Sequence, residues 1–387
     1  MISRLRRMFQ RREAAPNTAA LRFSRPLVLF QSDDWGRVGV RDREGWDELR
    51  AHGLNLGEKP YDFYSLETAD DLDALRDTLR KHRDSAGRNP CIGMNFIVAN
   101  VDFARALQQR GETATQEIPL RPLTEGFPQP WQRAGLKEAY EQGIGERLFY
   151  PALHGLTHFC VPAVARELQS NGDRNQLLFT LWQAGTPYIY WRMPWIGYEY
   201  WDPSMPADQR FLSVDKQRET IRRAAEIYRA LFASIPLSAC APGYRANEDT
   251  KTAWFEAGVR VVQGGPGGGR APSLDANGML LTFRNVEMEP ATEACQLENI
   301  IKQANNCLER GWPAIVSAHS INFHSTIRNF RTSTLTLLDG FLSAMEKRWP
   351  DLLYVNDADL WQIATEGFFA GNVETIKVGV TTPGSDR

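Results

Sequence analysis

The fold of this chain is indicated first by residues 27–36, which read LVLFQSDDWG. The apolar run 27–30 predicts a buried strand, and two carboxylates, Asp33 and Asp34, follow it just before a Trp-Gly turn. In an α/β barrel the carboxyl ends of the strands form the catalytic face. Because consecutive strand residues point to opposite sides, the two carboxylates can have different roles. Alone, the pair is equally compatible with a capped loop.

On either side of this stretch, short apolar runs alternate with segments of helical period, which is typical of βα units around a parallel sheet. We expect strands over 27–32, 92–98, 148–153, 237–240, 259–262, 279–283, 314–317 and 352–355. We expect helices over 69–82, 131–142, 214–232, 292–310 and 332–348. Seven or eight such units in 387 residues favour one barrel over two separate domains.

The sequence divides into a basic N-terminal tail over 1–24, a single catalytic barrel over 25–370 and a C-terminal tail over 371–387. An insertion at about 160–212 is rich in aromatic residues. They are Tyr188, Tyr190, Trp191, Trp195, Tyr198, Tyr200 and Trp201. Aromatic faces suit sugar rings, with Arg192 or Glu199 as a polar partner for hydroxyls. A local core or a subunit interface is the alternative interpretation.

Composition and charge limit the class of protein. Hydrophobic residues make up 42% and charged residues 24%, which is typical of a globular protein rather than a disordered or membrane-spanning one. A net charge of -2 argues against nucleic acid as a partner. Five cysteines without a C-x-x-C pair predict free thiols and a cytoplasmic location. Residues 1–12 are basic and amphipathic without a signal peptide, so they are a solvated tail or a peripheral contact with the inner membrane.

A pair of histidines follows the expected strand 148–153, in the order His154-Gly-Leu-Thr-His158. Histidines four apart lie on one side of a helical turn, where they can share one ion. Two surface histidines that flank a cap are the alternative. Asp34, His154 and His158 together supply three ligands and leave room for water, as catalytic metal sites require. We expect one divalent ion, with zinc as the first choice.

Two more strand ends carry polar groups. The sequence Ala241-Pro-Gly-Tyr-Arg245 follows one expected strand, and His319 ends another. Amide hydrolysis needs an acid to protonate the departing nitrogen, and histidine, with a pKa near 6.5, suits that role.

This ordered set of motifs resembles the polysaccharide deacetylase family, carbohydrate esterase family four. The family's motifs read T-F-D-D, H-(S/T)-x-x-H, R-x-P-Y and L-x-H along a distorted (β/α)7 barrel, and the resemblance covers roughly residues 27–319. It implies that Asp33 is the general base and His319 the general acid. It also implies that Asp34, His154 and His158 bind the metal.

The resemblance further implies a role for the backbone N–H of Tyr244, which would help to hold the tetrahedral oxyanion. Tyr244, Arg245, Trp35, Arg192 and Trp195 are the candidate substrate-binding residues.

The sequence departs from the family pattern at two places. Cys240 stands where the family has the arginine that pairs with the base, and Arg245 or Arg192 is the candidate to replace it. The glycine-rich segment 261–269 has no acid where the family has an Asp-and-Trp motif. Candidates to orient His319 in its place are Glu287, Glu289 and Asp357, and His324 is a second candidate for the acid.

The function implied is that of a metal-dependent carbohydrate N-deacylase, a deacetylase or deformylase. We expect an amino-sugar precursor of a bacterial surface glycan, linked to a nucleotide or a lipid, as substrate. The alternatives are a catalytically silent carbohydrate-binding barrel and a metal-dependent hydrolase of a non-sugar amide or ester. The sequence contains no G-x-G-x-x-G, G-x-x-x-x-G-K-[ST], H-E-x-x-H or G-x-S-x-G motif, which argues against dinucleotide, P-loop, zincin and serine-hydrolase chemistry.

Overall fold

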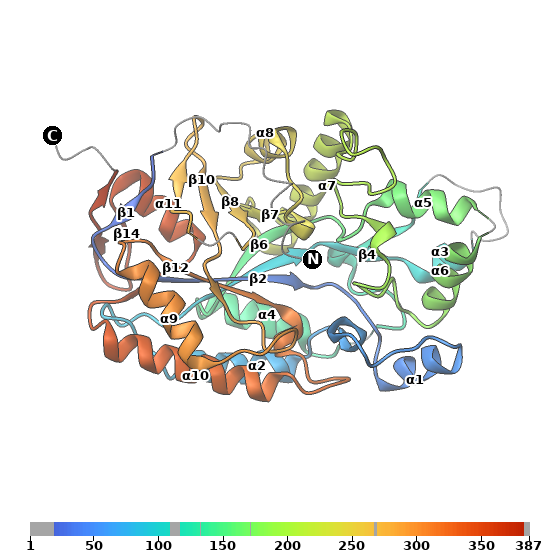
Figure 1. Cartoon of the computed structure of the whole chain (residues 1–387), viewed down its shortest axis with the longest axis horizontal. Coiled ribbons are helices and arrows are strands. Elements are labelled where there is room, and N and C mark those ends of the chain that lie inside the picture. The colour runs from blue at the N-terminus through green and yellow to red at the C-terminus, as the bar shows by residue number, and fades with distance from the viewer. Residues whose placement is uncertain (1–18, 109–116, 132, 171, 267–268, 383–387) are drawn as a thin grey trace, which may run out of the picture.

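The computed structural model describes residues 19–108, 117–131, 133–170, 172–266 and 269–382. Its centre is one curled sheet in which the order of the main strands is β12-β2-β3-β6-β7-β8-β10, and neighbouring strands in this order pair in parallel (Figure 1). These strands are β2 (Leu27–Trp35), β3 (Ile92–Ile97), β6 (Phe149–Gly155), β7 (Ser238–Cys240), β8 (Val261–Gly264), β10 (Leu280–Phe283) and β12 (Ala314–His319). The expected distorted (β/α)7 barrel is confirmed.

Shorter strands extend this sheet. The strands β11 (Val286–Glu287) and β13 (Leu353–Tyr354) pair in parallel with β12 and β2, and β9 (Ser273–Leu274) pairs antiparallel with β10. Within the described part of the chain, no pairing joins β10 to β11, so the sheet curls without closing. The residues that follow β10 therefore lie at an opening of the barrel.

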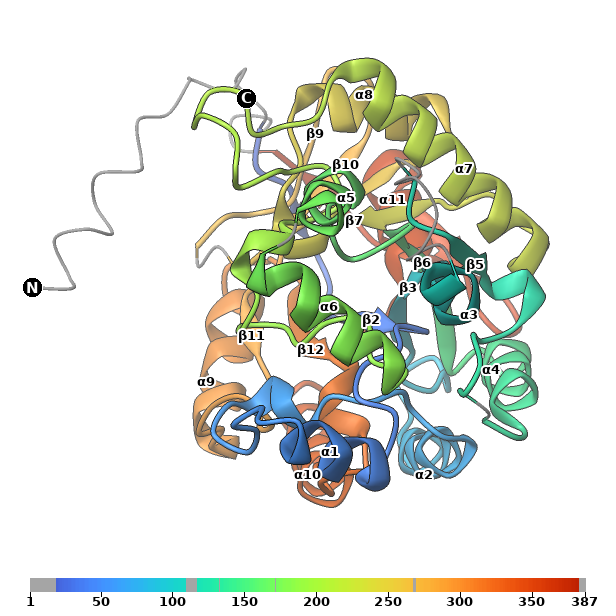
Figure 2. The same ribbon diagram turned by 90° about the vertical axis from the view of Figure 1, so that its right-hand side faces the viewer.

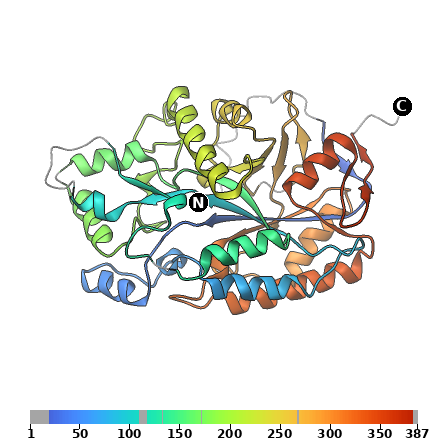
Figure 3. The same cartoon turned by 180° about the vertical axis from the view of Figure 1, so that it is seen from behind.

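Helices cover both sides of the sheet (Figures 1 and 3). One group contains α2 (Ala69–Leu79), α4 (Leu136–Gly145), α9 (Leu297–Leu308) and α10 (Arg331–Arg348), and the other contains α7 (Val214–Phe232), α8 (Glu248–Glu256) and α11 (Asp357–Glu366). The eight expected strands and five expected helices are all present. Two helices begin five residues later than expected, α4 at Leu136 and α9 at Leu297. Before α4, Gly135 has a left-handed φ of 72°, so the helix cannot extend back through it.

The insertion expected at about 160–212 contains α5 (Val161–Gln169), α6 (Asp173–Gln183) and the short 3-10 helix η5 (Pro194–Ile196). In Figure 1 the arrowhead of β2 points toward the face that Figure 2 shows, and α5 and α6 lie on that face. The insertion therefore covers the carboxyl ends of the strands.

The remaining helices are α1 (Arg43–Ala51) and α3 (Phe103–Gln108). The hairpin of β4 (Ala99–Val101) and β5 (Leu120–Pro122) follows β3 along the chain. None of the helices in the described residues is both long and apolar enough to cross a membrane. The expected membrane contact of residues 1–12 lies outside the described part of the chain.

Short strands form within both segments expected as tails. Where described, the C-terminal segment forms β15 (Thr375–Lys377) and β16 (Val380–Thr381), which pair with β14 (Phe368–Ala370) and β1 (Arg22–Phe23). The physical reason is burial, since Phe23, Ile376 and Val378 join one apolar cluster. The described segments near the two termini therefore pack together against the first residues of the barrel strands, such as Leu27 and Leu353.

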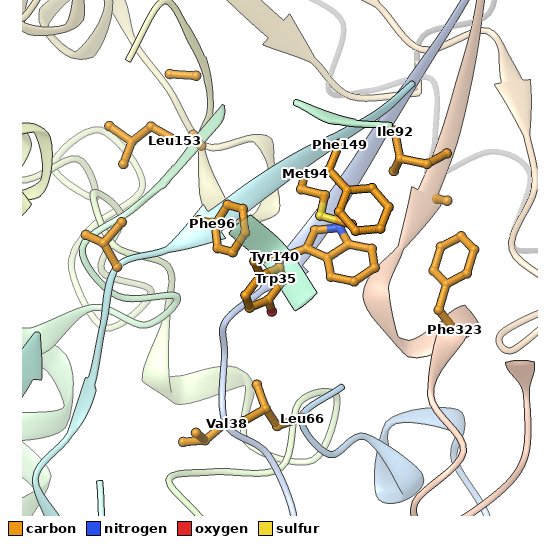
Figure 4. Close-up of a cluster of buried hydrophobic side chains, with 14 of the residues drawn as sticks. Trp35, Val38, Leu66, Ile92, Met94, Phe96, Tyr140, Phe149, Leu153 and Phe323 are labelled. Carbon is orange, nitrogen blue, oxygen red and sulfur yellow. The ribbon is translucent and has the colours of Figure 1, made fainter. Parts of the chain in front are cut away.

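Trp35 lies in the hydrophobic core (Figure 4). Its side chain is 0% exposed and stacks on Phe323, with ring centroids 5.7 Å apart. The expectation that Trp35 binds substrate is therefore not met, because β2 continues through it and turns its indole inward.

Candidate metal centre

The motif residues meet at one end of the sheet because their strands are parallel neighbours. Asp33 and Asp34 are among the last three residues of β2, and His154 lies near the end of β6. His319 is the last residue of β12, and the strand register places it directly beside Asp33. Three strands that are far apart in the sequence thus contribute to one site.

The three expected metal ligands converge. The Nε2 atoms of His154 and His158 lie 3.6 Å and 3.3 Å from Oδ1 of Asp34. Two atoms that each lie about 2.0–2.1 Å from one tetrahedral ion are roughly 3.4 Å apart. The spacing of these donor atoms therefore fits one shared cation.

The chemistry of the three donors also fits a cation. Oδ1 of Asp34 is buried and has no hydrogen-bond partner among the described residues. Nδ1 of His154 lies 2.9 Å from the backbone oxygen of Cys240, which favours the tautomer with its proton on Nδ1 and a free lone pair on Nε2. Burial, aided by nearby Arg37, lowers the pKa of His158 well below its usual value, so its imidazole stays neutral as a ligand must.

A second grouping, Asp33 with His154 and Cys240, also lies within ligand distance. It shares His154 with the first, so both cannot use the same nitrogen at once. Burial and the neighbouring Asp33 raise the pKa of the Cys240 thiol well above its usual value, and a protonated thiol is a poor ligand. The Asp34 grouping is therefore the better candidate.

The two histidines do not share a helical turn, contrary to expectation. His154 ends a strand, and His158 lies in the loop before α5. Gly155 reverses the chain between them with a φ of 116°, a conformation that L side chains rarely adopt. The imidazoles meet through this turn rather than through helical spacing.

Asp34 is held in an unusual conformation. Its φ is 73°, and the pairing of β2 with β3 shifts register between Ser32 and Trp35. Its backbone oxygen accepts a hydrogen bond from the Tyr64 hydroxyl at 2.7 Å. Left-handed non-glycine residues are uncommon and cluster at functional sites.

The second carboxylate oxygen of Asp34 faces an arginine. Nη2 of Arg37 lies 3.2 Å from Oδ2, and the guanidinium lies 3.9 Å from the centroid of the Tyr64 ring. Although burial disfavours its charge, Arg37 holds the pKa of Asp34 well below the usual value. Because Arg37 contacts Oδ2, the other oxygen, Oδ1, faces the two histidines.

Asp33 is paired with Arg284, which follows β10 at the opening of the barrel. The guanidinium donates at 2.6 Å to Oδ1 and at 2.8 Å to Oδ2, and Asn95 donates to Oδ1 at 2.6 Å. Burial opposes ionisation, but Arg284 and the nearby histidines lower the pKa of Asp33 below its usual value.

Arg284 therefore supplies the arginine that the sequence lacks at Cys240, and the expectation of Arg245 or Arg192 in that role is wrong. Arg192 donates to Asp62 instead, at 2.5 Å and 2.7 Å. Arg245 is exposed, with its guanidinium 4.9 Å from the centroid of the Trp201 ring.

His319 is oriented by Glu289, one of the three expected candidates. Nδ1 lies 2.7 Å from Oε1 of Glu289, and Nε2 lies 3.7 Å from Oδ2 of Asp33. Burial opposes the charge of His319, but Glu289 and Asp33 outweigh it and raise the pKa to about 9. At neutral pH this imidazole is protonated, and its side chain is 24% exposed.

The other two acids lie elsewhere. Asp357 accepts hydrogen bonds from Gln31, Ser238 and Gln263 inside the barrel, and the side chain of Glu287 is exposed. His324, the second candidate for the acid, lies 3.3 Å from Glu67 in a separate buried cluster. His319 remains the residue beside Asp33.

The remaining substrate-binding candidates, Tyr244 and Trp195, lie in different surroundings. The backbone N–H of Tyr244 donates to the oxygen of Ala241 at 2.8 Å, so it does not point to an oxyanion as expected. The hydroxyl of Tyr244 instead accepts from Arg284 at 3.0 Å. Trp195 lies in η5 with the guanidinium of Arg174 5.2 Å from its ring centroid.

Part of the aromatic insertion does reach the metal-ligand candidates. The His158 ring lies 5.2 Å from Tyr190 and 6.1 Å from Tyr198, centroid to centroid. Trp191, beside Tyr190, is 46% exposed. The insertion therefore contains a local core and, on the side of His158, an aromatic rim of Tyr190, Trp191 and Tyr198. The local-core interpretation is confirmed, and sugar binding stays a prediction.

Arg284 and Arg37 were missed by sequence reasoning. Arg284 directly follows the apolar strand 280–283, and a charged residue at a strand end was the available signal. Arg37 lies three residues after Asp34, which gave no signal of contact.

No protein-family model matches the sequence, and no curated protein matches it. Solved structures that it resembles include a Parabacteroides distasonis protein assigned as a glycoside hydrolase or deacetylase (11% identity, 91% of this chain, 74% of that chain, TM-score 0.46). A second is a peptidoglycan deacetylase from Bacillus subtilis, with 10% identity over 90% of this chain and 93% of that chain and a TM-score of 0.36. A third is a carbohydrate esterase family four pseudoenzyme from Bacillus anthracis, with 8% identity over 87% of this chain and 66% of that chain and a TM-score of 0.38. At these TM-scores the site assignment depends on the chain's own geometry. With its ordered motifs at the strand ends of a distorted barrel, the fold is consistent with a polysaccharide deacetylase-like protein.

Proposed function

We propose that this chain is a metal-dependent amide hydrolase that removes an acyl group, acetyl or formyl, from an amino sugar. The observation that carries the proposal is the buried Oδ1 of Asp34, which faces two imidazole nitrogens and has no hydrogen bond from the described residues. A buried carboxylate oxygen that faces two neutral imidazoles can be stabilised by a ring N–H or by a cation, and only a cation engages all three atoms at once.

Asp34, His154 and His158 would hold the ion. A divalent ion supplies Lewis acidity when bound, which polarises an amide carbonyl and lowers the pKa of water. The remaining chemistry belongs to residues beside the triad, which act on protons at defined atoms.

Asp33 is the proposed base. Its ion pair with Arg284 keeps the carboxylate ionised at neutral pH, so Oδ2 can accept the proton of an attacking water. The same ion pair fixes the orientation of the carboxylate.

His319 is the proposed acid. With its Nδ1 proton donated to Glu289, the protonated ring presents Nε2–H toward the site and can deliver it to the departing amine nitrogen. Base and acid lie on neighbouring strands, 3.7 Å apart between Oδ2 of Asp33 and Nε2 of His319. This separation places both groups within reach of one amide.

An amino sugar is the proposed substrate because of the aromatic rim. Tyr190 and Tyr198 lie against His158, and exposed Trp191 extends the rim outward. Pyranose rings stack on such faces. We further propose that the sugar is a nucleotide- or lipid-linked precursor of a bacterial surface glycan.

The test combines metal analysis with a product assay. Purified protein should contain about one divalent ion per chain, and His154→Ala should lose it. Acetate and formate release should then be assayed across nucleotide sugars, lipid-linked sugars and chitooligosaccharides. A folded wild-type protein that binds no divalent ion would contradict the proposal and favour a binding barrel.

A further inference from the structure

Glu199, a residue of the insertion, contacts the backbone of the loop between the two histidines. Its Oε1 accepts hydrogen bonds from the N–H of Leu156 at 2.6 Å and of Thr157 at 2.9 Å. The Glu199 side chain is buried, at 3% exposure. Both donors lie between His154 and His158, so one carboxylate oxygen fixes the segment that spaces the two imidazoles.

The other oxygen of Glu199 fills the space beside Gly155. A Cβ placed on Gly155 would lie 2.1 Å from Oε2, closer than any real contact allows. Glycine at position 155 is therefore needed twice, for its φ of 116° and for the close approach of Glu199. The turn and the carboxylate fit each other as a pair.

The insertion contacts this loop at two places, between the histidines and just after His158. Tyr198 and Trp201 exchange backbone hydrogen bonds at 3.0 Å and 2.8 Å, forming the tight turn that presents Glu199. Just past His158, the N–H of Cys160 donates to the oxygen of Ile196 at 2.9 Å. The side chain of Glu199 thus binds the loop between the two histidines, and a backbone hydrogen bond at Cys160 holds the chain just after it.

We propose that Glu199 is a positioning residue of the metal centre, and that the insertion sets the affinity for the ion through it. The inference rests on the metal triad of the proposed function. Without Glu199, two buried N–H groups lose their acceptor, and the loop gains freedom to move His158 away from Asp34. Preorganisation of the ligands, rather than any direct contact with the ion, is the contribution of Glu199.

The test measures Zn²⁺ affinity by competition with a chelator, together with the visible absorption of the Co²⁺-substituted protein. Glu199→Ala should weaken Zn²⁺ binding by about 10- to 100-fold, as is usual when a residue that orients a metal ligand is removed. Glu199→Gln keeps an acceptor oxygen and should stay within about threefold of wild type, which is below that range. The Co²⁺ spectrum should change in Glu199→Ala and be retained in Glu199→Gln.

Asp202→Ala is the matched control. Asp202 is a buried carboxylate of the same insertion, but it binds Arg166 and Ser204 rather than the histidine loop. Its removal should leave Zn²⁺ affinity unchanged. If Glu199→Ala does not fold, Glu199→Asp shortens the side chain while it keeps the charge, and should weaken Zn²⁺ binding by about tenfold, at the lower end of the usual range.

The outcomes separate the two proposals. If wild type binds Zn²⁺ and Glu199→Ala and Glu199→Asp bind it as tightly, or if Asp202→Ala weakens binding as much as they do, the inference is overturned while the proposed function stands. If wild type itself binds no divalent ion, both are overturned.

Discussion

Neighbouring residues Asp33 and Asp34 have sharply different surroundings. Asp33 has both oxygens hydrogen bonded, to Arg284 and Asn95, whereas Asp34 keeps Oδ1 without a partner among the described residues and points it at two imidazoles. The left-handed φ of Asp34 produces this divergence, since it turns the second carboxylate away from the regular strand. One carboxylate is thus suited to a proton and the other to an ion.

The Asp33→Asn variant tests this division. It should keep one divalent ion per chain, because Asp33 is not among the three proposed ligands, and should lose about 10²- to 10⁴-fold in kcat with the general base. Elemental analysis and steady-state kinetics on the same sample check both parts. Unchanged turnover would remove Asp33 from the reaction.

The pH dependence follows from His319. Its pKa is raised from 6.5 to about 9, so the acid form predominates at neutral pH and is lost as the pH rises through about 9. We expect kcat/KM to fall on that alkaline limb. Glu289→Gln removes the carboxylate that raises the pKa, so the limb should move to lower pH.

The raised pKa of His319 also makes the folded protein less stable as the pH rises. Because the folded-state pKa of His319 lies above its unfolded value, the stabilisation is complete below pH 6.5 and disappears as the pH rises through about 9. A pH–rate profile whose alkaline limb does not move in Glu289→Gln would contradict the pairing of these two residues.

At the scale of elements, strands position Asp33, His319 and two of the three candidate ligands, and a loop positions the third, His158. The parallel pairing of β12 with β2 places His319 beside Asp33 by register alone. The pairing of β6 with its neighbours brings His154 to the same end, but His158 arrives only through the turn at Gly155. This turn is therefore the element that brings His158 to the candidate metal centre.

Gly155→Ala tests the turn. A Cβ there would collide with Glu199, and the φ of 116° is strained for alanine, so both Zn²⁺ affinity and Tm should fall. Gly145→Ala is the control, because nothing lies within 4 Å of its added Cβ at the end of α4, and it should leave both quantities near wild type. Equal behaviour of the two variants would contradict the role of the turn.

The aromatic rim is tested by two tryptophans of the insertion. Trp191→Ala should raise KM for an amino sugar more than it lowers kcat, because Trp191 is exposed beside Tyr190. Trp195, which the sequence marked for this role, packs against the core and Arg174. We expect Trp195→Ala to change Tm more than KM, and the reverse result would restore the sequence-based choice.

At the scale of the whole molecule, a bound ion would link segments that are far apart in the chain. Asp34 belongs to the first strand of the barrel, and the histidines lie about 120 residues later, after the helices α1 to α4 and the strand β3. Any ligand that binds only the folded form stabilises it by mass action. Metal removal should therefore act on the global fold as well as on catalysis.

At 100 times its dissociation constant, an ion contributes about 2.7 kcal/mol, which for a chain of this length corresponds to roughly 3 °C in Tm. We expect a chelator to lower the Tm of wild type by that order and to leave the Tm of His154→Ala unchanged. Differential scanning calorimetry measures both. An equal shift in the two proteins would mean that the chelator acts elsewhere.

The sequence by itself determined the barrel and its eight expected strands, and it singled out Asp34, His154 and His158, which the fold brings together as candidate ligands. Apolar runs and motif spacing are local properties, so they can be read directly from the chain. The sequence also offered Glu289 as one of three acids that could orient His319, but no local feature distinguishes it from the other two. The helical turn expected for the histidines failed because nothing local to His154 and His158 reveals that Glu199 approaches from the insertion.

Only the tertiary structure decided the partners of the reacting groups. Arg284 reaches Asp33 across more than half of the chain, from the opening between β10 and β11, and Glu289 reaches His319 from the next segment. Burial then turned Trp35 into core and left Trp191 exposed. Ion pairs and burial depend on which surfaces the fold brings together, and this information is spread over the whole sequence rather than contained in any one motif.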